Sequence, residues 1–271
     1  MFRKSKVLAK IRAGQVARVC NLPYFLPFFP RMAAHHGFDA VWVDAEHRPF
    51  DPSEAQSLIA YHHLADIDCL WRPPTLEKTL LYRLLEDGAA GLMIPHVSTP
   101  EKAHMLAQAV KFPPLGDRGL DGSGLDGDFY INMPATYPQD ANRETFLVVQ
   151  IETPQALDHV EAIAATPGVD VLFLGPGDLS LRLDCAYGPN DPKMMAAQKK
   201  IAAAAKKHGK AWGRPVGNAA EAKTIIELGA QLVNLGGAFG AICEHLAQCS
   251  AQFDQVLGPA PASAKMAAKT N

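Results

Sequence analysis

Several short apolar runs in this sequence end in polar residues of the kinds that enzymes use. They are Asp44, Glu46 and His47 after one run, Arg72 after another, Gln150 and Glu152 within a third, and Gly175-Pro176-Gly177-Asp178 after a fourth. Carboxylates bind hard cations, arginine binds carboxylates or a developing oxyanion, and histidine transfers protons. This shared position at the ends of apolar runs predicts that the residues meet in one site.

Glu152 and Asp178 predict a metal site. Two oxygen ligands without a Cys or His pair suit Mg²⁺ or Mn²⁺, ions that keep water ligands for a substrate to displace. The spacing alone is also compatible with a helix-capping Asp178 and a solvated Glu152.

Arg72, His47 and the glycine turn each have a functional and a structural interpretation. Arg72 can hold a substrate carboxylate or stabilise an enolate, and a structural salt bridge is the alternative. His47 is an acid/base candidate oriented by a carboxylate, or an ordinary hydrogen-bonded side chain. The Gly175–Gly177 turn offers backbone N–H groups to an anion, or is a simple Gly-Pro turn.

The elements that must position these residues alternate between strands and helices. The predicted strands are Val16–Leu22, Asp39–Asp44, Asp68–Arg72, Gly91–Val97, Phe146–Thr153, Val169–Gly175, Ala211–Val216 and Gln231–Gly237. Helical patterns cover 51–64, 75–87, 99–111, 154–166, 191–208 and 218–229. Continuous apolar strands indicate a parallel sheet that is covered on both faces. Eight such units over about 250 residues predict an α/β fold, a (β/α)8 TIM barrel with its active site at the carboxyl ends of the strands. An open doubly wound sheet is the alternative.

The chain is predicted to form one domain over residues 1–257, followed by a disordered tail at 258–271. The Gly-, Asp- and Pro-rich segment 113–143 is predicted to be a functional lid. Lys and Arg total 26 against 28 Asp and Glu, so the net charge of −2 favours neither nucleic acid nor an anionic membrane as partner. The absence of a long apolar run or a secretory signal predicts a cytoplasmic protein without membrane spans.

Four blocks of the sequence resemble the HpcH/HpaI family of metal-dependent class II pyruvate aldolases. The blocks are Gly37–His47, Asp87–His96, Val149–Pro154 and Gly168–Ser180, and the resemblance runs from Ile11 to about Gly240. It implies a single TIM barrel of the phosphoenolpyruvate/pyruvate type. Hydroxy-heptenedioate aldolase and 2-dehydro-3-deoxyglucarate aldolase are members of this family.

The resemblance also implies a role for each candidate residue. Glu152 and Asp178 would bind the divalent metal, which is Mg²⁺ or Mn²⁺, with Co²⁺ as a further candidate. The substrate-binding residues would be Arg72, Gln150, Gly175, Pro176 and Gly177. His47 would be the acid/base, with Asp44 behind it. Its acidic partner, which an adjacent subunit often donates in the family, falls at Glu86, where Asp is usual; the neighbouring Asp87 is the alternative.

The implied reaction is that of a carbon–carbon lyase. A 4-hydroxy-2-keto acid would be cleaved to pyruvate and an aldehyde through an enolate, or formed from them. A Schiff-base mechanism would need a lysine inside the barrel, and the predicted strands contain none. The alternatives are a CoA-ester lyase, similar to the citrate lyase β-chain or malyl-CoA lyase, and a catalytically impaired barrel that binds a keto acid.

The resemblance finally implies a homo-oligomer, built from dimers and reaching a hexamer, with an exchanged C-terminal helix. The apolar run Phe239–Val256 fits that helix, and it fits the barrel's own eighth helix equally well. Gly177, the segment 119–132, and the ends of the first and eighth strands depart from the usual family pattern. The pyruvate half of the site is therefore better defined by the sequence than the aldehyde half.

Overall fold

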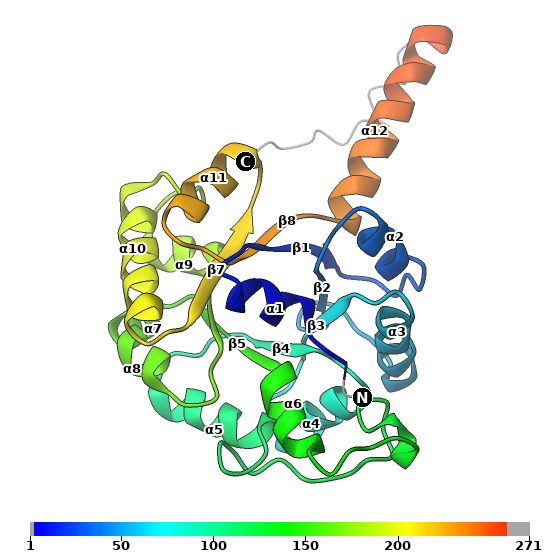
Figure 1. The fold of residues 1–271 in the computed structure, drawn as a ribbon. Helices are drawn as coiled ribbons and strands as arrows, with labels where there is room; N and C mark the ends of the chain where they lie inside the picture. Colours follow the sequence, from blue (N-terminus) through cyan, green and yellow to red (C-terminus); the bar gives the residue numbers. More distant parts are fainter. Residues whose placement is uncertain (1–2, 259–271) are drawn as a thin grey trace.

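A computed structural model of the chain, which describes residues 3–258, contains a closed barrel of eight parallel strands (Figure 1). Each strand pairs with the next one along the chain, and the last strand pairs with the first. The strands are β1 (Ala17–Leu22), β2 (Ala40–Asp44), β3 (Asp68–Arg72), β4 (Gly91–Ile94), β5 (Phe146–Ile151), β6 (Val171–Leu174), β7 (Ala211–Val216) and β8 (Leu232–Gly237). The prediction of a (β/α)8 barrel is confirmed, and the open sheet is excluded.

Helices follow the strands and surround the barrel. They are α1 (Lys6–Arg12), α2 (Phe29–His35), α3 (Pro52–Leu64), α4 (Lys78–Glu86), α5 (Pro100–Val110), η1 (Asp128–Tyr130), α6 (Tyr137–Glu144), α7 (Pro154–Asp158), α8 (Val160–Ala165), α9 (Pro176–Leu183), α10 (Pro192–Lys207), α11 (Ala219–Glu227) and α12 (Ala238–Leu257). Thr99, Thr153 and Asn218 cap their helices through their side chains. The predicted helix over 154–166 is divided at His159 into α7 and α8.

Alternation along the strands decides which side chains enter the barrel. Ala40, Trp42, Leu70, Val148 and Phe173 belong to an interior cluster, whereas their sequence neighbours pack outward against the helices. Since side chains alternate between the two faces of a strand, the next inward positions toward the carboxyl ends carry polar residues. These are Asp44 on β2, Arg72 on β3 and Gln150 on β5, and all three are buried.

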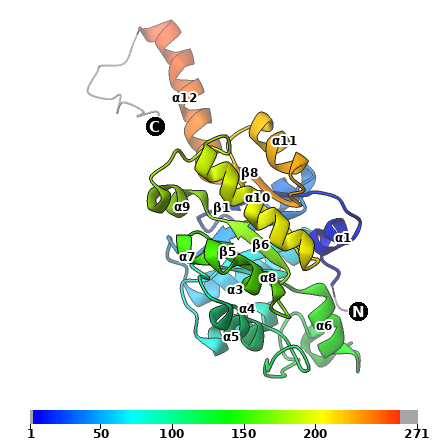
Figure 2. The ribbon, with the colours of Figure 1, turned by 90° about the vertical axis from the view of Figure 1, so that its left-hand side faces the viewer.

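Helix α1 closes the end of the barrel where the strands begin. Val7 and Leu8 join the interior cluster, and the side chain of Asp68 fixes the segment before the helix. Asp68 accepts hydrogen bonds from Ser5 Oγ at 2.6 Å and from the Val7 N–H at 2.9 Å, and it pairs with Arg3 at 2.6 Å. Figure 2 shows α1 and α6 at this end, opposite α7 and α9.

The segment 113–143 does not cover the mouth of its own barrel. It connects the end of α5 to the start of β5, so it lies at the same end as α1, where the strands begin. The rule that places active-site loops at the mouth applies to segments that follow strands, and this one follows a helix. The prediction of a lid is therefore wrong for this barrel.

Helix α12 leaves the barrel and projects outward (Figure 1). Ala238 is its one buried residue, while Phe239, Leu246 and Phe253 are more than half exposed. It does not pack along the barrel as an eighth outer helix. Apart from Gly258, the predicted tail 258–271 lies outside the described residues. Within residues 3–258, no helix has the length and apolar character needed to cross a membrane.

Candidate active site

Arg72 is the centre of a charged network at the carboxyl ends of β2 and β3. Asp44 and Arg72 are directly paired in register on these two strands. The guanidinium donates to both carboxylate oxygens of Asp44, at 2.9 and 2.7 Å, and lies 2.9 Å from Glu46 Oε2. It also donates to Gln150 Oε1 at 3.2 Å and covers the ring of Trp42. The predicted salt bridge is present, and the same guanidinium lines the cavity at the mouth.

Glu152 follows β5 and is buried at the mouth, with 2% of its surface exposed. Its Oε1 accepts a hydrogen bond from the backbone N–H of His96 at 2.5 Å, and its Oε2 accepts one from Gln150 Nε2 at 3.3 Å. Burial raises the pKa of this carboxyl, the His96 N–H lowers it, and the charge of Asp178 raises it. The interpretation of Glu152 as a solvated side chain is wrong.

Asp178 lies in the first turn of α9, which starts at the end of β6. The N-cap of this helix is Gly175 and receives no side-chain hydrogen bond, so the helix-capping interpretation of Asp178 is also wrong. Asp178 instead pairs with Arg182 one turn later, at 2.5 Å. A side chain at Gly175 would overlap Glu152 Oε2, because the strand end packs directly against that carboxylate. The glycine lets the carboxylate reach the start of α9.

The turn at the start of α9 offers fewer donors than the sequence indicates. Gly175 N–H bonds to the carbonyl of Ile151 at 3.3 Å, and Pro176 has no N–H. The donors left for an anion are the first-turn N–H groups of Gly177 and Asp178, which have no acceptor within the helix. Gly177 has open space where a side chain would stand, so a small residue fits there as well.

These residues line one cavity of about 180 Å³. Its walls include Arg72, Gln150, Glu152, Gly175–Asp178 and Tyr187. Two neighbouring carboxylates of like charge, one of them buried, form a donor set that a hard divalent cation stabilises. Within residues 3–258, no group of three His, Cys, Asp or Glu side chains could hold a metal ion together. The pair therefore fits an ion that completes its shell with water or substrate.

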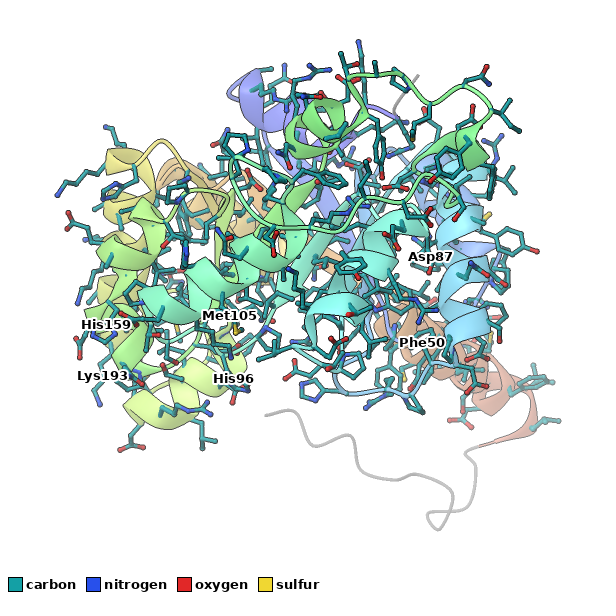
Figure 3. All side chains as sticks on the ribbon, turned by 90° about the horizontal axis from the view of Figure 1, so that it is seen from below. Phe50, Asp87, His96, Met105, His159 and Lys193 are labelled. Atoms are coloured by element: carbon teal, nitrogen blue, oxygen red, sulfur yellow. The ribbon has the colours of Figure 1, made fainter. Side chains whose placement is uncertain are left out.

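The structure separates three residues that the sequence analysis groups together. The His47 side chain is 58% exposed, and its Nε2 lies 3.7 Å from Glu46 Oε2. Asp44 meets His47 through the backbone N–H of that residue, at 3.5 Å, because its carboxylate is bonded to Arg72. Glu86 ends α4 at the opposite end of the barrel; its neighbour Asp87 lies far from His96 in Figure 3. Burial raises the pKa of Glu86 to about 7.

Two residues at the mouth, Glu46 and His96, have contacts that the sequence did not predict. Glu46 pairs with Arg72 and faces both His47 and His96. His96 follows β4 and contacts Glu152 with its backbone and its ring, whose Nδ1 lies 3.0 Å from Oε1. Each residue lies two positions after the end of a strand, and this signal was available in the sequence. Lys102 of α5 donates to the carbonyl of His96, and burial lowers the pKa of this lysine.

A closed barrel with carboxylates and an arginine at the carboxyl ends of its strands defines the chain as a TIM-barrel enzyme. The family model described as HpcH/HpaI aldolase/citrate lyase matches residues 19–243. The 5-keto-4-deoxy-D-glucarate aldolase of Klebsiella pneumoniae is 34% identical over 237 residues, which cover 87% of this chain and 91% of that protein.

Solved structures agree with this match. The HpcH/HpaI aldolase from Desulfitobacterium hafniense DCB-2 superposes with a TM-score of 0.87 at 31% identity, covering 93% of this chain and 98% of that one. A family protein from Burkholderia cenocepacia J2315 gives a TM-score of 0.83 at 29% identity, covering 92% and 99%. The chain belongs to the HpcH/HpaI aldolase/citrate lyase family, and it is a lyase of the aldolase type.

Proposed function

We propose that the protein cleaves a 4-hydroxy-2-keto acid to pyruvate and an aldehyde, or catalyses the reverse condensation, with Mg²⁺, Mn²⁺ or Co²⁺. The observation that carries the proposal is the placement of Glu152 and Asp178 beside Arg72 in one cavity. The named aldolase relatives support the same reaction class. A cytoplasmic location stays a prediction.

Glu152 and Asp178 would hold the divalent ion. When bound, the ion would polarise the keto group of the substrate and stabilise negative charge on its oxygen. The N–H groups of Gly177 and Asp178 are available for the substrate carboxylate at the start of α9. Gln150 bridges Arg72 and Glu152 and so fixes the distance between the cationic and anionic sides of the site.

Arg72 would stabilise the oxygen of the enolate that carbon–carbon cleavage leaves behind. Asp44 holds the guanidinium through two hydrogen bonds, so the group is oriented before substrate arrives. A fixed donor of this kind loses no reorganisation energy when the charge develops.

His47 is the proposed acid/base, and its exposed ring can exchange protons with water at the mouth. Glu86 cannot join it within one subunit, since α4 ends on the far side of the barrel. If Glu86 is the acidic partner of His47, it acts on the His47 of another subunit.

We also propose a homo-oligomer built from dimers, up to a hexamer, which the placement of Glu86 and the exposed apolar residues of α12 support. Phe239, Ile242, Leu246, Phe253 and Val256 of this helix are exposed. Burying a phenylalanine or leucine side chain contributes about 1.5–3 kcal/mol, so a projecting apolar helix favours association. We propose that α12 is exchanged between subunits and packs on a partner barrel.

Proton exchange into pyruvate tests the function without knowledge of the aldehyde. We expect the methyl protons to exchange with deuterium in the presence of Mn²⁺ or Mg²⁺, to stop exchanging with a chelator, and to resume when metal is restored, as followed by NMR. Glu152→Gln and Asp178→Asn should abolish exchange, whereas Asp158→Asn, which alters an exposed carboxylate, should not.

Two results would contradict the proposal. One is a folded wild-type protein that catalyses no exchange with any of the three metals, which would favour the CoA-ester or non-catalytic alternatives. The other is full exchange by Glu152→Gln or Asp178→Asn, which would remove that residue from the metal site.

A further inference from the structure

We propose that His96 is a positioning residue that holds Glu152 in place and thereby sets the affinity of the Glu152–Asp178 pair for a divalent cation. The inference rests on the proposed function, because it assigns those two carboxylates to the metal. His96 lies on the loop between β4 and α5, and Figure 3 labels it at the mouth.

The backbone of His96 adopts a conformation that is uncommon for residues other than glycine. Its φ is +53°, in the left-handed region, which asparagine, aspartate and histidine enter more often than other side chains. Such a conformation costs free energy and persists where the surroundings enforce it, often at functional sites. Here it lets the backbone N–H and the ring Nδ1 reach the same atom, Glu152 Oε1, at 2.5 and 3.0 Å.

The loop is held from both sides while it makes this contact. The N–H of Val97 donates to the carbonyl of Gln150 at 3.2 Å, which ties the loop to β5. Lys102 Nζ donates to the carbonyl of His96 at 3.0 Å, which ties the loop to α5. The left-handed residue is thus anchored between two elements and is not a mobile tip.

The His96 N–H donates to Oε1 and the ring nitrogen Nδ1 contacts the same atom, which leaves the other oxygen of Glu152 with a defined direction. Oε2 accepts a hydrogen bond from Gln150 and faces Gly175. Gly175 is the N-cap of α9, the helix that carries Asp178 in its first turn. Hydrogen bonds to a metal-binding carboxylate fix its orientation, and their removal typically weakens metal affinity 10- to 100-fold. The far side of the His96 ring faces Glu46, with Nε2 3.8 Å from Oε1, so the ring spans two carboxylates.

Substitutions at position 96 distinguish the contribution of the His96 ring from that of its backbone. His96→Gly keeps the left-handed conformation and the N–H but removes the ring, and we expect Mn²⁺ to bind the metal-free protein about 10-fold more weakly, measured by calorimetry or EPR. His96→Asn tolerates the same backbone and carries an amide donor, so it should recover part of the loss. Asp184→Gly, which removes another left-handed side chain, is the matched control and should leave the Mn²⁺ affinity unchanged.

A second readout needs no metal. In ¹⁵N spectra of the metal-free protein, Glu152→Gln should shift the Nδ1 resonance of one histidine, and that resonance should be missing in His96→Gly. The inference is overturned if His96→Gly binds Mn²⁺ within twofold of the wild-type affinity. It is also overturned if Glu152→Gln leaves the His96 resonance unmoved. Wild-type protein that binds no Mn²⁺ instead overturns the proposed function, so the two failures are distinguishable.

Discussion

Both ends of the barrel contain an arginine paired with buried carboxylates, but the two clusters are neutralised in different ways. Where the strands begin, Asp68 is fully buried and bonded to Arg3, Ser5 and Val7 of the N-terminal segment. At the mouth, Arg72 is shared between Asp44 and Glu46, while Glu152 and Asp178 stand beside it with like charge.

The difference indicates which cluster is structural and which is functional. Asp68 is paired with Arg3 of its own chain, so this buried carboxylate leaves no uncompensated charge for a ligand to neutralise and stabilises the fold. The mouth carries more carboxylates than its buried arginine neutralises, and an excess of buried negative charge is stabilised by a bound cation. Substitutions at the mouth should therefore reduce activity more than stability, and substitutions at the closed end should reduce stability more than activity.

The largest effect should come from Arg72→Ala. The substitution removes the donor proposed for the enolate oxygen and leaves Asp44 and Glu46 facing each other, so we expect pyruvate exchange to fall about 10²- to 10³-fold. Mn²⁺ affinity should change much less, because Arg72 does not hold the metal. Arg72→Lys keeps the charge but not the two-point contact with Asp44, so its exchange rate should lie between those of the wild type and Arg72→Ala. Exchange by Arg72→Ala at the wild-type rate would exclude the enolate role.

The barrel could be predicted from the sequence because its strands carry strong local signals. All eight predicted strands exist, since buried parallel strands such as Phe146–Ile151 are unbroken apolar runs. No residue range was predicted for helices α1, α2, α6 and α9. Each has seven or eight residues, too few for a clear period, and α9 begins with Pro and Gly, which signal a turn.

The site could be predicted only in part. Glu152, Asp178, Arg72 and Gln150 meet in one cavity because strand ends converge in a barrel. The partner of Asp44 was not predictable, since it depends on the register between β2 and β3. The contact between His96 and Glu152 depends on the left-handed backbone of His96, and a histidine in the sequence does not predict that conformation.

At the closed end, Asp68→Ala should reduce stability with little effect on chemistry. Removing one partner of a buried ion pair typically costs about 3–5 kcal/mol, so urea unfolding at fixed protein concentration should show a loss of this order. Exchange per folded molecule should stay near wild type. Asp66→Asn is the control, because Asp66 pairs with the same Arg3 but is 71% exposed, such pairs contribute at most about 1 kcal/mol, and asparagine tolerates the left-handed backbone at this position. Equal losses for the two variants would contradict the assignment of Asp68 to the fold.

Glu86 should give the smallest effect, and one that depends on pH. Burial raises its pKa from 4.5 to about 7, so between these values the folded protein holds a proton that the unfolded chain has lost. Stability from this group is therefore present at low pH and is lost as pH rises through about 7. Glu86→Gln stays neutral throughout and should unfold at nearly the wild-type temperature at pH 5 but above it at pH 8. A difference in melting temperature that is constant from pH 5 to 8 would show that the carboxyl is not shielded from water at this end of the barrel.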